Sequence, residues 1–114
     1  MSTNDQIKTN LRLPASELKE IENYAKKLHF ASLSEAVRVL IARRLITDSN
    51  IEIPHYQKTE ILQKKITFTE EQWNAITEYQ HNRRINSRNE AIRLLILEGL
   101  EIEKINLQLK SFSD

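Results

Sequence analysis

Two short segments of the chain alternate between apolar and polar residues, and each is followed by two stretches with apolar residues at helical spacing. The alternating segments are residues 10–13 (NLRL) and 65–68 (KITF). Because this alternation has the period of a β-strand, each segment predicts a strand with one buried face. Apolar residues recurring three or four positions apart predict four helices, at about 15–28, 33–46, 70–83 and 88–100, the last extending toward Lys110.

The two halves of the chain are copies of one another. When the chain is shifted by 55 positions, residues 11–45 align without a gap with residues 66–100, and nine positions are identical. Ordinary composition would produce about two identities by chance. The repeat predicts the following organisation: a flexible N-terminal arm (1–7), copy one (8–47), a linker (48–63), copy two (64–100), and a helical extension and tail (101–114).

The second helix of each copy has the same start signal. Residues 32–35 (SLSE) and 87–90 (SRNE) both follow the S-x-x-E pattern of a capping box. In such a box the serine oxygen accepts a hydrogen bond from a backbone N–H, and the glutamate reaches back to the cap. We therefore expect Glu35 and Glu90 to be capping partners.

A strand-helix-helix unit of this size must pair with another one. A lone strand cannot satisfy its backbone groups, and so short a unit cannot bury a sufficient core. We expect a mainly α fold in which the strands form a short two-stranded antiparallel β-ribbon in front of four helices. The pattern leaves open whether the strands join within one chain or are swapped between two chains. The ribbon face toward the helices would carry Leu11, Leu13, Ile66 and Phe68.

The outer face of such a ribbon would present polar side chains that suit a nucleic acid. These side chains are Lys8, Asn10, Arg12, Gln63, Lys65 and Thr67. A two-stranded ribbon fits the DNA major groove, where Arg and Lys bind guanine, Asn and Gln bind adenine, and Thr serves either. One such strand is explained as an ordinary solvated face. Two donor-rich strands, each leading to a capped helix, favour DNA-base contact.

Composition removes several classes of protein. The chain has 114 residues and no cysteine, which excludes disulfide scaffolds and thiolate zinc sites. No apolar run approaches the ~20 residues of a membrane span, so we expect a cytoplasmic protein without a membrane partner. The net charge is only +1, yet copy one has eight Lys plus Arg against four Glu and copy two has six against five. The basic charge therefore lies on the two units predicted to bind.

The remaining chemistry-bearing residues have structural explanations. His29, His55 and His81 share no helical face, so we expect no metal site and no cofactor. No nucleophile is paired with a base, so we expect no enzyme activity. Arg38 and Arg93 recur on the second helix, where a phosphate contact and a salt bridge within the same repeat are equally good interpretations.

Three short segments of the chain resemble those of a known protein family. The segment 10–14 (NLRLP) looks like an Arc-type strand, and 32–38 (SLSEAVR) and 87–93 (SRNEAIR) resemble the second-helix signature of the ribbon-helix-helix, Arc/MetJ/CopG-type, DNA-binding proteins. The resemblance covers both copies. It implies a tandem ribbon-helix-helix chain that forms an intramolecular pseudo-dimer and reads bases with its strands. It also implies that the start of each second helix clamps a phosphate, through Ser32, Leu33, Ser34, Ser87, Arg88 and Asn89.

The chain departs from this family in two informative places. A glycine commonly ends the family's first helix in a left-handed cap, whereas His29 and Arg84 stand there in this chain. A left-handed non-glycine residue costs roughly 1 kcal/mol, so we expect the turn to be rebuilt. Copy two also has Thr67 where copy one has Arg12, so the two copies should prefer different bases.

We therefore expect sequence-specific binding of double-stranded DNA, used for transcriptional repression, with two or more chains associating on the DNA. One alternative is a relaxosome accessory protein at a conjugative transfer origin, of the TraY type, with a relaxase or another protein as partner. A second alternative does not involve DNA: a helical protein-interaction module whose ribbon is only structural.

Overall fold

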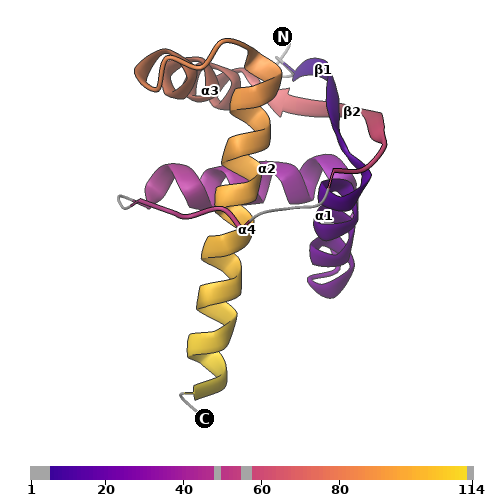
Figure 1. The fold of residues 1–114 in the computed structure, drawn as a ribbon, viewed down its shortest axis with the longest axis vertical. Coiled ribbons are helices and arrows are strands. Elements are labelled where there is room, and N and C mark those ends of the chain that lie inside the picture. Colours follow the sequence, from indigo (N-terminus) through magenta and orange to yellow (C-terminus); the bar gives the residue numbers. More distant parts are fainter. Residues whose placement is uncertain (1–5, 48–49, 55–57, 113–114) are drawn as a thin grey trace, which may run out of the picture.

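The structure, a computed structural model, describes residues 6–47, 50–54 and 58–112. It is mainly helical with one two-stranded antiparallel sheet, which confirms the predicted fold class at this level (Figure 1). None of the helices in this part of the chain has the length and apolar character needed to traverse a bilayer. The elements are β1 (Gln6–Pro14), α1 (Ala15–Lys27), α2 (Leu33–Ile46), β2 (Ile61–Thr69), α3 (Glu70–Asn82) and α4 (Arg88–Phe112).

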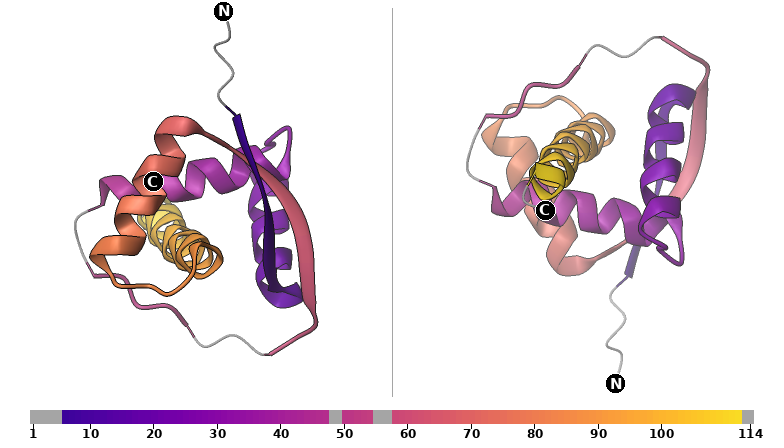
Figure 2. Two further views of the ribbon diagram at one scale, coloured as in Figure 1. Left: turned by 90° about the horizontal axis from the view of Figure 1, so that it is seen from above. Right: turned by 90° about the horizontal axis from the view of Figure 1, so that it is seen from below.

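The strands β1 and β2 pair over their whole length and form a ribbon with one open face. The pairing runs from Gln6 opposite Thr69 to Pro14 opposite Ile61. Each strand is longer than its alternating pattern predicted, because an antiparallel partner satisfies backbone groups whatever the side chains are. The views from above and below show the ribbon in front of α1 and behind it, respectively, so the helices cover only one face (Figure 2).

The longer strands shift two of the predicted boundaries. Gln6 and Ile7 belong to β1, although we assigned them to the N-terminal arm, and the rest of that arm lies outside the described residues. Residues 61–63 belong to β2 instead of the linker. The helix α4 includes most of the predicted extension and continues to Phe112.

The covered face of the ribbon supplies part of a single apolar core. The four residues predicted to face the helices are at most 2% exposed: Leu11, Leu13, Ile66 and Phe68. The middle of α2 and the first half of α4 supply the other large part of this core. Their fully buried members are Ala36, Val37, Leu40, Ile41, Ala91, Ile92, Leu95 and Ile96.

The serine half of each predicted capping box is present. Ser32 Oγ accepts a hydrogen bond from the Glu35 N–H (3.1 Å), and Ser87 Oγ accepts one from the Glu90 N–H (3.1 Å). The glutamate half is wrong for Glu90, whose carboxylate accepts a 2.6 Å hydrogen bond from Arg93. A charged guanidinium one turn further along the helix is a stronger donor than a backbone N–H, which explains the exchange.

The turn after each first helix keeps the left-handed cap that we expected to be rebuilt. His29 has a φ of 60° and Arg84 a φ of 53°. The following N–H groups close both turns, because Phe30 donates to the Ala25 carbonyl (2.9 Å) and Ile85 to the Gln80 carbonyl (3.0 Å). Phe30 and Ile85 also pack against the core. These contacts offset a strain of roughly 1 kcal/mol per turn, and the prediction of rebuilt turns was wrong.

The helices α2 and α4 approach each other so closely that one position of α4 has no room for a side chain. Gly99, the only glycine of the chain, lies in α4 against the α2 backbone. A Cβ atom at this position would be 2.3 Å from the Leu40 carbonyl oxygen and 2.9 Å from its carbonyl carbon. Backbone atoms cannot yield as a flexible side chain does, so the crossing of α2 and α4 requires glycine.

We predict that Gly99→Ala destabilises the protein by about 2 kcal/mol. Forcing the two helices apart costs about 3 kcal/mol, and the better helix propensity of Ala returns about 1 kcal/mol. Urea unfolding followed by circular dichroism measures the difference. Asn106→Ala, at an exposed position of the same helix, is the control and should change stability by less than about 0.5 kcal/mol. Equal effects of the two variants would contradict the close-packing argument.

Candidate nucleic-acid interface

The structure brings all six predicted base-contacting residues to the open face of the ribbon. Five of them are exposed, and Thr67 is half-buried. Because side chains alternate along a strand, residues two apart on β1 and β2 lie on the same side. They form three facing pairs across the ribbon: Lys8 with Thr67, Asn10 with Lys65, and Arg12 with Gln63.

The two copies meet at the centre of this face. Asn10 and Lys65 are equivalent residues of the two copies, and they stand directly opposite each other. The equivalent of Arg12 is Thr67, at the other end of the ribbon. The ribbon backbone is therefore approximately two-fold symmetric, while its two ends carry different hydrogen-bonding groups.

Each end of the ribbon is fixed to the start of a second helix by equivalent hydrogen bonds. Ser34 Oγ, in α2, accepts a 3.0 Å hydrogen bond from the Thr67 N–H. Asn89, at the same position of α4, accepts from the Arg12 N–H (2.8 Å) and donates to the Arg12 carbonyl (2.9 Å). The distance between the ribbon and each helix N-terminus is thus set by direct contacts.

Our sequence analysis missed this role of Ser34 and Asn89. The available signal was the short polar residue at the third position of both S-x-x-E segments. The Ser34 hydroxyl proton and one amide N–H of Asn89 are not used in these contacts, so they remain as donors for a phosphate beside the backbone N–H groups of both residues.

The helix N-termini beside the ribbon retain unused donors. Ser32 accepts from the Glu35 and Ala36 N–H groups through its side chain and its carbonyl, and Ser87 does the same in copy two. In the described part of the chain no acceptor faces the next N–H groups, which belong to Leu33, Ser34, Arg88 and Asn89. Such N–H groups, together with the helix dipole, form a binding site for an oxyanion.

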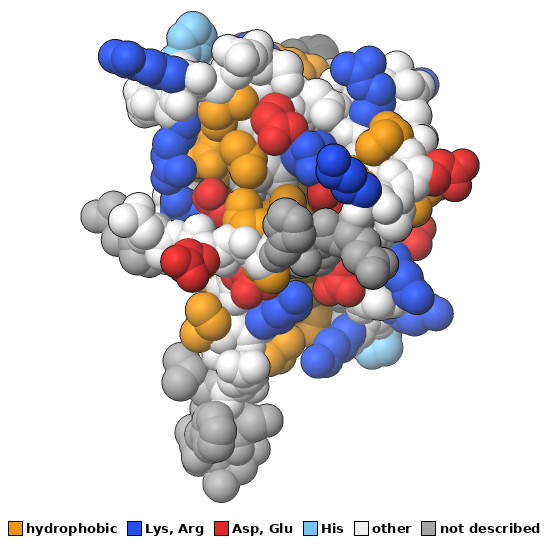
Figure 3. All heavy atoms as spheres, in the orientation of Figure 1, with side chains coloured by type: hydrophobic (Ala, Val, Ile, Leu, Met, Phe, Trp, Pro, Cys, Tyr) orange, Lys and Arg blue, Asp and Glu red, His pale blue; other side chains and the backbone are white. Residues whose placement is uncertain are grey.

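The two copies differ in side-chain charge at this point. Arg88 lies 4.7 Å over the Trp73 ring and donates to Gln80 Oε1 (2.6 Å), whereas its equivalent in copy one is Leu33. Arg84 beside it is exposed. Basic side chains are visible over the α3 end and beside the ribbon at the top of Figure 3. At this position copy two therefore has a cation where copy one has an apolar residue, while in copy one Lys26 lines the surface beside Ser32 and Leu33.

The recurring arginines of the second helices have structural partners. Arg93 forms two hydrogen bonds with Glu17 of the other copy (3.0 and 2.7 Å), and these bonds raise the pKa of its guanidinium. Arg38 donates to the Thr67 carbonyl (2.7 Å). Of the two interpretations left open by the sequence, the salt bridge within one repeat holds for Arg93 through Glu90 (2.6 Å), and the bonds to Glu17 are an additional link between the copies. Arg38 is held by the ribbon backbone.

A second polar cluster lies where the end of α2 meets the middle of α4, away from the ribbon. The Tyr24 hydroxyl donates to Glu103 (3.0 Å), and the Tyr79 hydroxyl donates to Glu98, which also binds the buried Arg44. Burial, and after it the neighbouring carboxylate, raises the pKa of both tyrosines. These hydroxyls keep their protons at neutral pH and join the helices.

In the described ranges no group of three or more His, Asp or Glu side chains is placed to hold a metal ion, and His55 lies outside them. Comparisons with protein-family models, with curated proteins and with solved structures gave no match. The chemistry of this chain must therefore be argued from its own residues.

We predict that the two ribbon anchors act locally and independently. Asn89→Ala should accelerate amide hydrogen exchange of Arg12 about fivefold, because each lost hydrogen bond contributes about 1 kcal/mol. Ser34→Ala should do the same for Thr67. Each variant is the control for the other, since the distant amide should keep its rate. Exchange that rises equally at both amides would show global destabilisation instead of local anchoring.

Proposed function

We propose that the chain is a tandem ribbon-helix-helix protein, an intramolecular pseudo-dimer that binds double-stranded DNA in a sequence-specific manner. One observation carries the proposal: six side chains rich in hydrogen-bond donors share the uncovered face of one ribbon, and a helix N-terminus with unused N–H groups stands at each end. A ribbon that is only structural needs a solvated face, but it does not need two oxyanion sites placed symmetrically beside it.

In the proposed complex the ribbon lies in the major groove. Its width admits two strands, and the base edges there present a distinct pattern for each base pair. Arg12 binds guanine at one end together with Gln63, while Lys8 and Thr67 act at the other end. Asn10 and Lys65 lie over the centre of the site. Because the ends differ, the preferred site of one chain is not a perfect palindrome.

The helix N-termini position the ribbon on the DNA. The free N–H groups at the starts of α2 and α4 bind the phosphates that flank the groove, which fixes orientation without reading sequence. Arg84 and Arg88 add charge on the side of copy two. Such occupancy of an operator is sufficient for transcriptional repression, and we propose this as the use of the protein.

We expect two chains to bind side by side, in contact through the part of α4 that projects from the body (Figure 1). Ile105 in this segment is 49% exposed. Deleting residues 105–114 should lower cooperativity on a two-site DNA more than affinity for one site. This truncation retains Ile102 and Glu103, which are buried and needed for folding. Identical binding curves on both DNAs would remove the α4 extension from the assembly.

Arg12→Ala should weaken binding to the preferred site by about 1–3 kcal/mol and relax the preference at one base pair. Binding sites selected from random DNA by the wild type and by the variant measure both effects. Lys27→Ala removes an exposed charge from the far end of α1 and is the control, which should select the wild-type sequence. The same selected sequence from Arg12→Ala would mean that the ribbon face does not read bases.

A further inference from the structure

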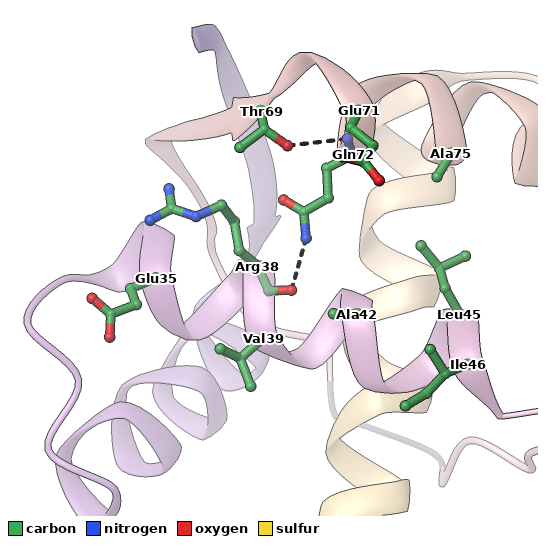
Figure 4. A pocket seen from close by; sticks show the side chains of 10 residues that line it. All are labelled: Glu35, Arg38, Val39, Ala42, Leu45, Ile46, Thr69, Glu71, Gln72 and Ala75. Carbon is green, nitrogen blue, oxygen red and sulfur yellow. Dashed lines mark hydrogen bonds between the residues drawn. The ribbon is translucent and has the colours of Figure 1, made fainter. Parts of the chain in front are cut away.

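A groove between α2 and α3 is open to solvent. It has a volume of about 490 Å³, and its two ends differ in character (Figure 4). The end near the close of α2 is apolar, with Ala42, Leu45 and Ile46, of which Ile46 is 76% exposed. The end near the start of α3 is polar and includes Glu35 and Glu71.

The equivalent surface of the other copy, between α4 and α1, is filled by the chain itself. The position of Ala42 is taken there by Leu97, which is only 4% exposed. Residues 50–54 of the linker lie beside Glu101, the equivalent of Ile46, and Ile53 packs against the core. Figure 1 shows this extended segment passing across α4.

The linker also accepts hydrogen bonds from the backbone N–H groups at the start of α1. The Glu60 carbonyl accepts from the Ala15 N–H (2.8 Å), and Thr59 Oγ1 accepts from the Ser16 N–H (3.0 Å). The equivalent residues of α3 are Glu70 and Glu71. Among the residues that the structure describes, no acceptor faces their N–H groups.

The polar end of the open groove has further polar groups that lack partners among the described residues. Gln72, the equivalent of Glu17, donates to the Arg38 carbonyl (2.8 Å), while its buried Oε1 has no hydrogen-bond partner among the described residues. Neither Glu35 nor Glu71 takes part in an ion pair within the described part of the chain. Arg38 also lines this end and carries a positive charge, so the end has charges of both signs and one amide oxygen that requires a hydrogen-bond donor.

We propose that the α2–α3 groove is a docking site for an extended segment of a partner protein. The segment carries two aliphatic residues two positions apart, which lie at the apolar end beside Ala42 and Ile46. Its backbone carbonyls then lie at the start of α3, where they accept from the Glu70 and Glu71 N–H groups as the Glu60 carbonyl does from Ala15. The linker binds the equivalent surface in this way, because residues 50–54 lie beside Glu101, Ile53 packs against the core and the Glu60 carbonyl caps the start of α1. This inference rests on the repeat and is independent of DNA binding.

The chain's own linker supplies a suitable probe. A synthetic peptide of residues 48–60, added in trans to the isotope-labelled full chain, should shift the amide resonances of Ala42, Glu71 and Ala75 in a saturable manner. The same peptide with Ser in place of both isoleucines should not. Shifts confined to the α4–α1 side, or no shifts at all, would overturn the proposal.

Ala42→Leu tests the site directly, because leucine already occupies the equivalent position in copy two. It should weaken peptide binding at least tenfold while leaving thermal stability and DNA binding unchanged. Asn74→Leu, at an exposed position of α3 that does not line the groove, is the matched control and should bind as the wild type does. Equal affinity of the two variants would contradict docking in this groove.

Further measurements distinguish two alternative occupants of the groove, the N-terminal segment of the chain and a second copy of the protein. If deleting residues 1–5 shifts the Ala42 and Ala75 resonances of the free chain, the N-terminal segment fills the groove and the proposal is wrong. If the free chain self-associates and Ala42→Leu abolishes this, the occupant is a second copy, and the proposal of a partner protein is again overturned.

Discussion

Everything in this structure depends on the backbone pairing of β1 with β2. Each strand belongs to a copy that has no other strand, so its N–H and C=O groups have no partner within that copy. Pairing the strands brings Leu11 and Phe68 onto one face and gives the helices of both copies a common surface to cover. The same pairing creates the opposite face, which no helix covers and on which the candidate interface lies.

The two copies differ in one polar contact at their interface. Glu17 and Arg93 form an ion pair between copies, whereas the equivalent residues Gln72 and Arg38 meet through a backbone carbonyl and leave one amide oxygen unpaired. Apolar packing tolerates gradual change in side-chain volume, but an ion pair is lost by a single substitution. The copies therefore keep their core and their capping serines, while this ion pair is present on one side only.

The sequence was sufficient to predict the fold class, the buried face of the ribbon and the six side chains on its outer face, because each follows from a period of two or of about 3.6. It was insufficient where the local conformation depends on contacts between residues that are far apart in the sequence. The left-handed turns at His29 and Arg84 persist because the following residues dock on the core, and no local pattern shows this. The anchoring by Asn89 and the linker over α4 likewise depend on three-dimensional proximity.

The linker places both strands of the ribbon in one covalent chain, and this changes the physical regime of folding. A ribbon shared by two separate chains dissociates on dilution, so its stability depends on protein concentration. Here the second strand meets the first at an effective concentration set by the linker, commonly in the millimolar range for short flexible linkers. With β1 and β2 paired within one chain, ribbon formation is unimolecular, and the candidate interface on its open face does not depend on protein concentration.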